Sequence, residues 1–492
     1  MGNCDCRVKE IDENIEEESN NLKLDDFCLL YPIGRGGFGR VWKVRLKRQY
    51  TIKTLDIRLL KNKSRIFAMK EMSKAKVYLK KSVKSVANER RFLEMFNYNL
   101  LCNMYYAFQD ADTLYIVMDY LSGGDLRYHI CRKSYFTEIE TKFIAACITL
   151  SLNYIHNKNV IHRDLKPENL VFGADGYLHL TDFGIAMEYK KGEDIVSASG
   201  TPGYMAPEAI INKPHDFCVD YFALGVIVYE LMMGERPYQG KNRKEIKEQM
   251  FTIEIKVDNE DLPDDWNDDN ILDFINKLLK RKKGKRLGCK GCSEIKEHPW
   301  FKDVQWDQIE NCTFASPFSF ESEDNFDDSY AQKQDNDSIY EGKKELYIIE
   351  VNESKTFKNF YFNIEEKLAE QHQSARKKEK KGTKTSISSK TSTKKLREDS
   401  IVIHNGNNIR SSIVRKSARY KGICPDSGNK IINVMKRRES KFGSIHLNFN
   451  LNNVKLKDNN KEKDKDKDKD KDKDKDKDKD KDNEKNKIKE SN

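Results

Sequence analysis

Three short motifs carry the residue types that phosphate chemistry needs. They are His-Arg-Asp-Leu-Lys-Pro-Glu-Asn at 162–169, Asp-Phe-Gly at 182–184 and Ala-Pro-Glu at 206–208. In phosphoryl transfer the protein mainly positions the reactants and offsets charge. We expect Asp164 to accept a hydroxyl proton and Lys166 to steady the moving phosphoryl group. Asn169 and Asp182 are expected to hold Mg²⁺ through hard oxygen ligands. The chance that all three motifs occur in this order at random is negligible.

A glycine-rich segment precedes these motifs. Gly34, Gly36 and Gly39 follow the order G-x-G-x-x-G, with apolar residues at strand-like alternation on both sides. Glycines let the backbone approach phosphate oxygens, and Val41 suits the face of a purine ring. Because the segment continues as a strand, we favour a phosphate-binding hairpin over a dinucleotide-binding turn, which needs a helix there. The predicted nucleotide contacts are Ile33, Gly34, Arg35, Gly36, Gly37, Phe38, Gly39, Arg40 and Val41.

A lysine must hold the α- and β-phosphates, and two candidates follow the hairpin. Lys53 lies in Thr-Ile-Lys and Lys70 in Phe-Ala-Met-Lys. We prefer Lys70 because Ala68 is small enough to lie against an adenine and because Glu89, on a helical pattern, suits an ion pair. This choice makes residues 47–66 a basic insertion between two strands, for which a tolerated surface loop is the expected structure.

Composition indicates how much of the chain can position these residues. The chain has 492 residues, of which 90 are basic and 80 acidic, so its formal charge of +10 says little about partners. Aromatic and aliphatic residues are plentiful up to about residue 363. Beyond it Lys, Asp, Asn, Ser and Glu dominate, and such a segment buries too little apolar surface to offset its ordering entropy. We therefore expect a folded region followed by a disordered tail.

Membrane spans, export signals and disulfide frameworks are not indicated. The longest mainly apolar stretch, 222–233, is far shorter than the roughly 20 residues of a span and is predicted to be a buried helix. The N-terminus lacks the basic and apolar segments of a secretory signal. Eleven irregularly spaced cysteines favour a reducing compartment. Cys289 and Cys292 form a Cys-x-x-Cys, but no second pair lies at zinc-site spacing.

Taken together, residues 27–363 resemble the eukaryotic protein kinase superfamily. Four segments resemble its AGC group, that of the cyclic-nucleotide-dependent kinases: Phe-Ala-Met-Lys at 67–70, Gly-Gly-Asp-Leu at 123–126, Gly-Thr-Pro-Gly-Tyr at 200–204 and Lys-Arg-Leu-Gly at 285–288. The segments 123–130 and 204–208 also resemble the YANK branch. The resemblance implies an α+β, bilobal protein kinase fold with a small β-rich N-lobe and a larger helical C-lobe. It also implies a serine/threonine protein kinase that uses ATP and Mg²⁺.

The implied domain organisation has four parts. They are a flexible N-terminal segment (1–26), the protein kinase domain (27–301), an AGC-type C-terminal extension (302–363) and a disordered low-complexity tail (364–492). In the extension, residues 325–330 resemble a tether whose Phe and Tyr flank the nucleotide site. Residues 357–362 resemble a hydrophobic motif whose two aromatic rings dock on the N-lobe and hold the Glu89 helix. Tyr361 stands where many relatives carry a phosphorylatable Ser or Thr.

Further residues take roles by matching positions of the family. Met118 matches the gatekeeper beside the adenine, and Asp119 and Leu121 match the hinge that hydrogen-bonds it. Asp125 is assigned to the same nucleotide site. Four positions are structural: Asp220 and Gly225 on the helix that anchors the catalytic loop, and Glu208 with Arg286 as an ion pair.

The acceptor and its sequence context also follow from the resemblance. Lys166 and Thr201 match the serine/threonine pattern, so the predicted acceptor is an alcohol rather than a phenol. Glu168, Glu230 and Asp125 match positions that read basic residues before the acceptor, because guanidinium and carboxylate pair in a forked geometry. We therefore predict a preference for Arg or Lys about three positions upstream, and a weaker one at two.

Regulation is predicted at the segment that follows the catalytic motifs. Arg163, directly before Asp164, needs an anion to neutralise it, and Ser197 lies where the AGC pattern places its activating phosphate. Phosphorylation of Ser197 by an upstream activating kinase is expected to order this segment. The alternative is that Ser197 is an ordinary polar loop residue.

The two ends of the chain indicate contact with membranes. The start, Met-Gly-Asn-Cys-Asp-Cys, resembles a myristoylation signal at Gly2, although Cys6 stands where Ser or Thr is preferred. One acyl chain binds membranes only marginally, so stable anchoring needs palmitate on Cys4 or Cys6. Basic stretches of the tail add attraction for anionic lipid. We expect a cytoplasmic protein that associates with membranes when acylated, and a plain flexible N-terminus is the alternative.

Two other classes of function compete with catalysis. An inactive kinase that acts only as a scaffold is disfavoured, because the residues that inactive kinases usually lack are all present. They are Lys70, Asp164, Asn169 and Asp182. A nucleic-acid-binding protein is disfavoured because the basic tail has almost no interleaved aromatic residues, which stacking platforms need. The expected partners are therefore proteins with Ser or Thr acceptors, and no specific nucleic acid.

Overall fold

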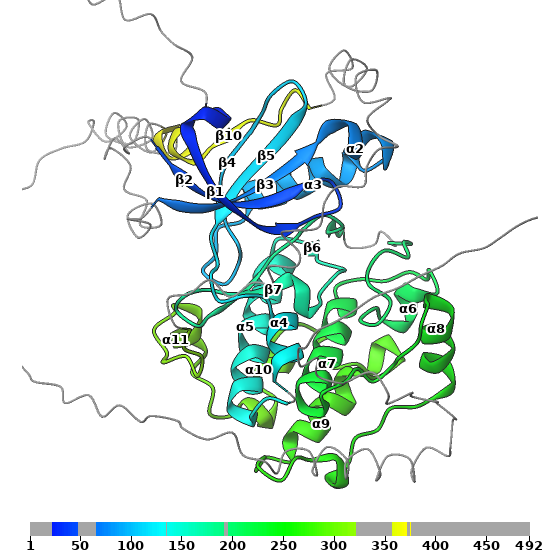
Figure 1. Ribbon diagram of the computed structural model, residues 1–492. Coiled ribbons are helices and arrows are strands. Elements are labelled where there is room, and N and C mark those ends of the chain that lie inside the picture. The colour runs from blue at the N-terminus through cyan, green and yellow to red at the C-terminus, as the bar shows by residue number, and fades with distance from the viewer. Residues whose placement is uncertain are drawn as a thin grey trace, which may run out of the picture. The chain divides into compact units, whose positions relative to one another are not determined.

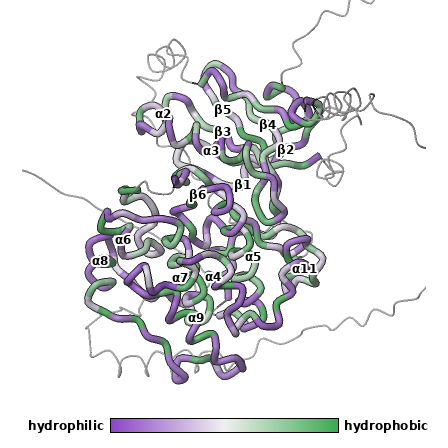
Figure 2. Tube along the Cα trace, turned by 180° about the vertical axis from the view of Figure 1, so that it is seen from behind, coloured by the Kyte–Doolittle hydropathy of each residue, from purple (hydrophilic) through white to green (hydrophobic). Residues whose placement is uncertain are grey.

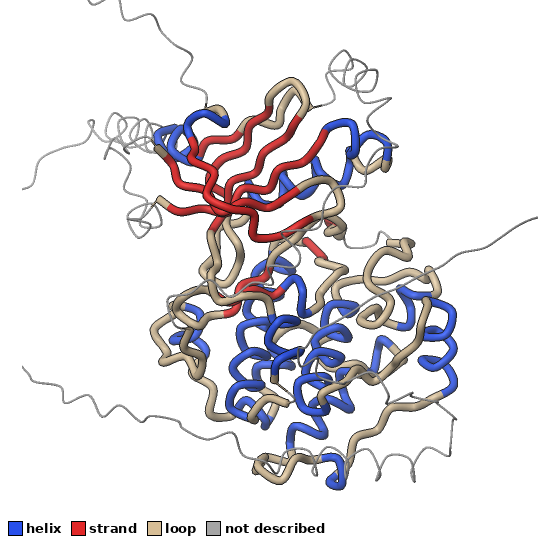
Figure 3. Tube along the Cα trace, in the orientation of Figure 1, coloured by secondary structure: helices blue, strands red, loops and turns tan. Residues whose placement is uncertain are grey.

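The computed structural model describes residues 22–47, 65–133, 135–190, 195–320, 357–370 and 374. In this part of the chain most strands gather in one lobe and most helices in another (Figure 3). The predicted α+β fold, with a β-rich N-lobe and a helical C-lobe, is confirmed. The predicted tether at 325–330 and nearly all of the predicted tail lie outside the described residues.

The N-lobe is built on an antiparallel sheet (Figure 1). Within the described residues its order is β1-β2-β3-β5-β4-β10. The strands are β1 (Phe27–Arg35), β2 (Arg40–Leu46), β3 (Ile66–Ser73), β4 (Met104–Gln109), β5 (Thr113–Asp119) and β10 (Phe362–Asn363). The register places Lys70 of β3 opposite Val41 of β2 and Ile116 of β5. The predicted insertion does lie between two strands, β2 and β3, and residues 48–64 of it lie outside the described part.

The C-lobe is organised around two long helices, α5 (Glu138–Asn157) and α7 (Cys218–Met233). α5 begins with a capping box formed by Thr137 and Glu140. The predicted buried helix over 222–233 is part of α7, in which every residue except the last is buried. α7 ends at Gly234, whose φ of 74° is a left-handed conformation that glycine adopts at low cost. Figure 2 shows hydrophobic residues along α7, whereas α8 (Arg243–Thr252) is mostly hydrophilic.

Shorter elements complete the two lobes. The helices are α2 (Lys74–Leu79), α3 (Val83–Met95), α4 (Leu126–Arg132), α6 (Pro207–Ile210), α9 (Asn270–Leu278), α10 (Ser293–Lys296) and α11 (Trp306–Glu310). The 3-10 turns are η1 (Leu24–Asp26), η2 (Pro167–Asn169), η3 (Asn259–Asp261), η4 (Lys283–Lys285) and η5 (Pro299–Phe301). Two small antiparallel pairs frame the catalytic motifs: β6 (Val160–Ile161) with β9 (Met187–Glu188), and β7 (Leu170–Phe172) with β8 (Leu178–Leu180).

The predicted hydrophobic motif docks on the N-lobe. Phe357 and Phe360 are both buried, and the following strand, β10, pairs with β4. Arg90 of α3 donates through Nε to the Phe360 carbonyl over 3.1 Å and through Nη2 to the Tyr361 carbonyl over 2.6 Å. Gln109 of β4 donates to the Phe357 carbonyl over 2.8 Å. The motif is therefore bonded to the helix that carries Glu89, as predicted.

The predicted start of the disordered tail at residue 364 is too early. Residues 364–370 are helical, and Ile364 is buried against the N-lobe core. Lys367 donates from Nζ to the Glu94 carbonyl over 2.8 Å, which fastens this helix to α3. Composition alone missed the segment because its order comes from contacts with the N-lobe, among them Leu368 against the core and the Tyr106 hydroxyl, which donates to Glu365 over 2.9 Å.

Candidate active site

The glycine-rich hairpin between β1 and β2 exposes Gly36 and Gly37 at its tip, where Lys80 Nζ donates to the Gly37 carbonyl over 2.5 Å. Gly36 N–H donates to the Gly39 carbonyl over 2.9 Å. A Cβ on Gly39 would come within 2.0 Å of the Glu71 carbonyl oxygen on β3, so only glycine fits there. A Cβ on Gly37 would meet no atom within 4 Å, so the tip of the hairpin is open. The other predicted nucleotide contacts between residues 33 and 41 lie on β1, on β2 or in this hairpin. Such an open backbone suits phosphate oxygens.

Lys70 of β3 and Glu89 of α3 form the predicted ion pair. Lys70 Nζ lies 2.6 Å from Glu89 Oε1, and both side chains are largely buried. Burial by itself lowers the pKa of Lys70, but the charges of Glu89 and Asp182 outweigh it and hold the pKa above its usual value. Lys70 therefore carries the positive charge that a phosphate-binding lysine needs.

The adenine end of the predicted site lies where β5 leaves the sheet. Ala68 of β3 faces Met118 of β5 in the register. The Asp119 carboxylate accepts hydrogen bonds from the backbone and the side-chain nitrogen of Asn103, over 2.9 and 3.0 Å. The Asp119 carboxylate therefore forms its hydrogen bonds within the protein. The Asp119 N–H also donates to the Asn103 carbonyl over 3.0 Å, and the purine contacts of Asp119 and Leu121 stay a prediction.

Asp164 lies at the centre of a compact hydrogen-bonded group. Its Oδ1 accepts from the Thr201 backbone N–H over 2.9 Å and from Thr201 Oγ1 over 2.7 Å. Its Oδ2 accepts from Lys166 Nζ over 2.6 Å. Lys166 Nζ also donates to Thr201 Oγ1 over 3.0 Å, and Asn169 Nδ2 donates to the Asp164 carbonyl over 2.9 Å. The structure thus brings four of the predicted residues together around one carboxylate.

A buried carboxylate on α7 holds this catalytic loop. Asp220 is 1 % exposed. Its Oδ2 accepts from the His162 backbone N–H over 2.9 Å and lies 2.8 Å from His156 Nε2, while its Oδ1 accepts from the Arg163 backbone N–H over 2.9 Å. Burial by itself raises the pKa of Asp220, but the hydrogen bond and charge of His156 and the charge of His162 lower it. An ionised side chain therefore fixes the two residues that precede Asp164.

The donor set of Asn169 and Asp182 fits Mg²⁺. Asp182 has a φ of 60°, which is sparsely populated by residues other than glycine, and its Oδ1 accepts from the Gly184 N–H over 3.2 Å. Burial by itself raises the pKa of Asp182, but the charge of Lys70 and the Gly184 hydrogen bond lower it below its usual value. Mg²⁺ prefers oxygen ligands and binds through one or two carboxylates together with substrate phosphates. One ionised carboxylate and one amide oxygen meet that requirement.

Arg163, next to Asp164, has an incomplete set of partners. Its Nε donates to the Ile185 carbonyl over 2.8 Å, and its Nη2 contacts the same oxygen. Its Nη1 is buried without a hydrogen-bond partner, and burial lowers the pKa of this guanidinium. Ser197 hydrogen-bonds Ser199 through the two hydroxyls over 2.8 Å. Residues 191–194 of this segment lie outside the described part. An anion beside Arg163 would satisfy the buried nitrogen.

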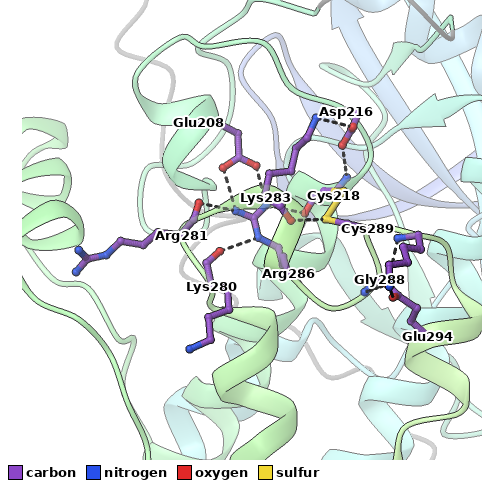
Figure 4. Close-up of a disulfide and its surroundings, with 11 residues drawn as sticks. Glu208, Asp216, Cys218, Lys280, Arg281, Lys283, Arg286, Gly288, Cys289 and Glu294 are labelled. Carbon is purple, nitrogen blue, oxygen red and sulfur yellow. Dashed lines mark hydrogen bonds and ion pairs between the residues drawn. A yellow bond between two sulfur atoms is a disulfide. The ribbon is translucent and has the colours of Figure 1, made fainter.

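Glu208 and Arg286 form the predicted ion pair (Figure 4). Arg286 Nη1 lies 2.6 Å from Glu208 Oε1, and Nη2 lies 2.9 Å from Oε2, so the pair is bidentate. Nη1 also donates to the Cys218 carbonyl over 3.0 Å, at the first residue of α7. The pair therefore joins the Ala-Pro-Glu motif to the start of the helix that also holds the catalytic loop.

A disulfide that was not predicted joins Cys218 to Cys289 beside this ion pair (Figure 4). The two residues are 71 positions apart in the sequence, and their Cα atoms lie 5.2 Å apart. The spacing of the two cysteines does not indicate a disulfide, because only the folded C-lobe brings them together. Cys292, the other half of the Cys-x-x-Cys, is a free thiol. No cluster of three or more His, Cys, Asp or Glu that could hold a metal occurs among the described residues.

The predicted substrate-reading carboxylates have partners within the chain. Glu168 and Glu230 both bind Arg127 of α4, over 3.0 and 2.9 Å. Asp125 caps α4, because its Oδ1 accepts from the Tyr128 backbone N–H over 2.8 Å, and burial raises the pKa of Asp125. Sequence reasoning missed Arg127. The sequence did show a basic residue two positions after Asp125. Within the segment 123–130, however, a role was predicted only for Asp125, as a nucleotide and substrate contact.

Comparison with known proteins identifies similar chains. The family model described as "Protein kinase domain" matches residues 27–301. Serine/threonine-protein kinase sgk-1 of Caenorhabditis elegans is 36 % identical over 62 % of this chain and 65 % of its own length. The cAMP-dependent protein kinase type 3 of Saccharomyces cerevisiae is 33 % identical over 62 % of this chain and 71 % of its own length. For three of the curated relatives the chain spans 62 %, 65 % and 56 % of the relative's length.

The relatives also bear on the predicted subgroup. They include a cGMP-dependent protein kinase of Drosophila melanogaster, 33 % identical over 64 % of this chain and 32 % of its own length, beside the cAMP-dependent one. The predicted resemblance to the group of cyclic-nucleotide-dependent kinases is therefore confirmed. The YANK branch stays a prediction.

Proposed function

The chain belongs to the protein kinase domain family, and on this premise we propose that it transfers the terminal phosphate of ATP to serine or threonine hydroxyls of other proteins. The observation that carries the proposal is the Asp164 carboxylate, which is held within hydrogen-bond distance of both Lys166 and Thr201. Two findings support an alcohol acceptor: Lys166 and Thr201 match the serine/threonine pattern, and serine/threonine-protein kinases are among the similar chains.

Each side chain of the site has a task in this reaction. Asp164 takes the proton of the acceptor hydroxyl, and Lys166 places a positive charge where the phosphoryl group moves. Lys70, held by Glu89, binds the α- and β-phosphates under the open glycine hairpin. Asn169 and Asp182 are the residues that would hold Mg²⁺, which when bound neutralises charge on the phosphate oxygens.

The role of Asp164 is tested by Asp164→Asn. The variant keeps the shape of the side chain but loses the proton acceptor, so phosphate transfer should fall by about 10²–10⁴-fold. Transfer of the labelled terminal phosphate from ATP to serine-containing and tyrosine-containing acceptor peptides measures it. Asp303→Asn changes an exposed aspartate and is expected to keep wild-type activity. Transfer by Asp164→Asn within threefold of the wild type, or transfer to tyrosine alone, would contradict the proposal.

We also propose that phosphate on Ser197, added by an upstream kinase, activates the enzyme. The buried Nη1 of Arg163 supports this proposal, since a phosphate carries about two negative charges and strong acceptor oxygens. Ser197→Ala is expected to lower activity by about tenfold or more. The mass of the intact variant should also lack one phosphate that the wild type carries. Ser199→Ala, which changes the neighbouring hydroxyl, is the matched control. Undiminished activity of Ser197→Ala would refute this regulation.

Membrane association through acylated Gly2 is proposed on the sequence alone, because residues 1–21 lie outside the described part. No helix among the described residues is long and apolar enough to cross a bilayer. Gly2→Ala removes the acceptor of the acyl chain and should move the protein from the membrane fraction to the cytoplasmic fraction of the cell. Asn3→Ala keeps Gly2 and serves as the control. An unchanged distribution of Gly2→Ala would count against acylation.

The preference for Arg or Lys upstream of the acceptor stays a prediction. Of its three carboxylates, Glu168 and Glu230 are bonded to Arg127, and Asp125 is the N-cap of α4.

A further inference from the structure

Arg127 of α4 directs its guanidinium at an acidic pair, Glu168 and Glu230. Its Nε lies 3.0 Å from Oε1 of Glu168, and its Nη1 lies 2.9 Å from Oε1 of Glu230. Its Nη2 lies 3.3 Å from Oε2 of Glu230 and also contacts the hydroxyl of Tyr204. Every guanidinium nitrogen of Arg127 therefore has a partner in this cluster.

Glu230 has little capacity for a second cation. Its side chain is 4 % exposed, and its Oε2 also accepts from the Tyr204 hydroxyl over 2.6 Å. Burial by itself lowers the pKa of Arg127, but the hydrogen bond to Glu230 and the nearby negative charges raise it. Arg127 stays charged, and its removal leaves a buried carboxylate without a cation, which is strongly unfavourable.

The acidic pair lies on the acceptor side of the site. Glu168 follows Asp164 by four residues in the same loop, and 44 % of its side chain is exposed. Tyr204 follows Thr201, which hydrogen-bonds Asp164, by three residues. A peptide that brings its hydroxyl to Asp164 therefore places neighbouring residues against this cluster.

A second guanidinium lies on the same surface. Cζ of Arg236 is 5.8 Å from the centre of the Tyr204 ring. A Cβ on Gly203 would come within 2.0 Å of Arg236 Nη1, so Arg236 lies where a side chain at position 203 would begin. Arg127 thus binds both carboxylates of the acidic pair, and Arg236 adds a second positive charge beside Tyr204.

We propose that Arg127 is a specificity-determining residue: it takes the place of a basic substrate residue, so the enzyme does not favour Ser or Thr preceded by Arg or Lys over Ser or Thr preceded by uncharged residues. The inference rests on the proposed function and runs opposite to the preference predicted from the sequence. A side chain tethered beside its partners acts at an effective concentration of about millimolar or more. A substrate arginine at lower concentration does not displace it.

The test compares two serine peptides that differ only at the second and third residues before the acceptor, both Arg in one and both Ala in the other. The measured quantity is the ratio of their kcat/KM values with the full chain. For the wild type, the kcat/KM values of the two peptides are expected to differ by less than about threefold. Arg127→Ala frees the acidic pair and should favour the Arg peptide by about tenfold or more, the effect of a hydrogen bond to a charged group.

Two variants control for structural effects. Arg132→Ala changes the other arginine of α4, whose guanidinium lies 3.4 Å from the centre of the Tyr128 ring, and should keep the wild-type ratio. Arg127→Lys keeps a positive charge but loses the forked geometry, so it should give an intermediate ratio. Arg127→Lys, together with the ratio of the wild type, also decides the question if Arg127→Ala does not fold.

The outcomes separate the inference from the function on which it rests. A wild-type preference for the Arg peptide of about threefold or more, or an unchanged ratio in folded Arg127→Ala, overturns the role of Arg127 and leaves the proposed kinase activity standing. Absence of transfer by the wild type to both peptides and to its own chain overturns the proposed activity, and the inference with it.

Discussion

The carboxylate of Asp220 is the interaction on which the rest of the site depends. It lies in α7, the most thoroughly buried helix of the C-lobe, and accepts hydrogen bonds from two consecutive backbone N–H groups of the catalytic loop. A buried N–H that loses its acceptor costs about 1–3 kcal/mol, so the loop is held far more firmly than an exposed connection would be. The scaffold is hydrophobic, but the backbone directly before Asp164 is fixed by this one charge, and Lys166 and Thr201 then hold the Asp164 carboxylate.

A second line of contacts reaches the site from the C-terminal extension. Phe357 and Phe360 dock on the N-lobe, and Arg90 of α3 binds the backbone of that motif. The preceding residue of α3, Glu89, holds Lys70, whose charge in turn favours the ionised form of Asp182. The ion pair of Lys70 and the ionised form of Asp182 are therefore linked to a segment at least 175 residues downstream of both.

Residue types and spacing within the sequence predicted the glycine hairpin and the pair of Lys70 with Glu89. The fold and the pair of Glu208 with Arg286 were implied by the resemblance to the kinase superfamily, and the structure confirms them. Three other features could not be predicted. They are the Cys218–Cys289 disulfide, the binding of Glu168 and Glu230 to Arg127, and the ordered helix over 364–370. In each case the partner lies on another element, or the order depends on a docked neighbour, and residue type alone points elsewhere.

Amide hydrogen exchange at His162 and Arg163 tests the central claim that Asp220 fixes the catalytic loop. Asp220→Asn replaces one accepting oxygen with an amino group and should release at least one of these hydrogen bonds. The account predicts that both amides exchange as slowly as the α7 core in the wild type, and about tenfold or more faster in the variant. Equal exchange rates in the two proteins would contradict it.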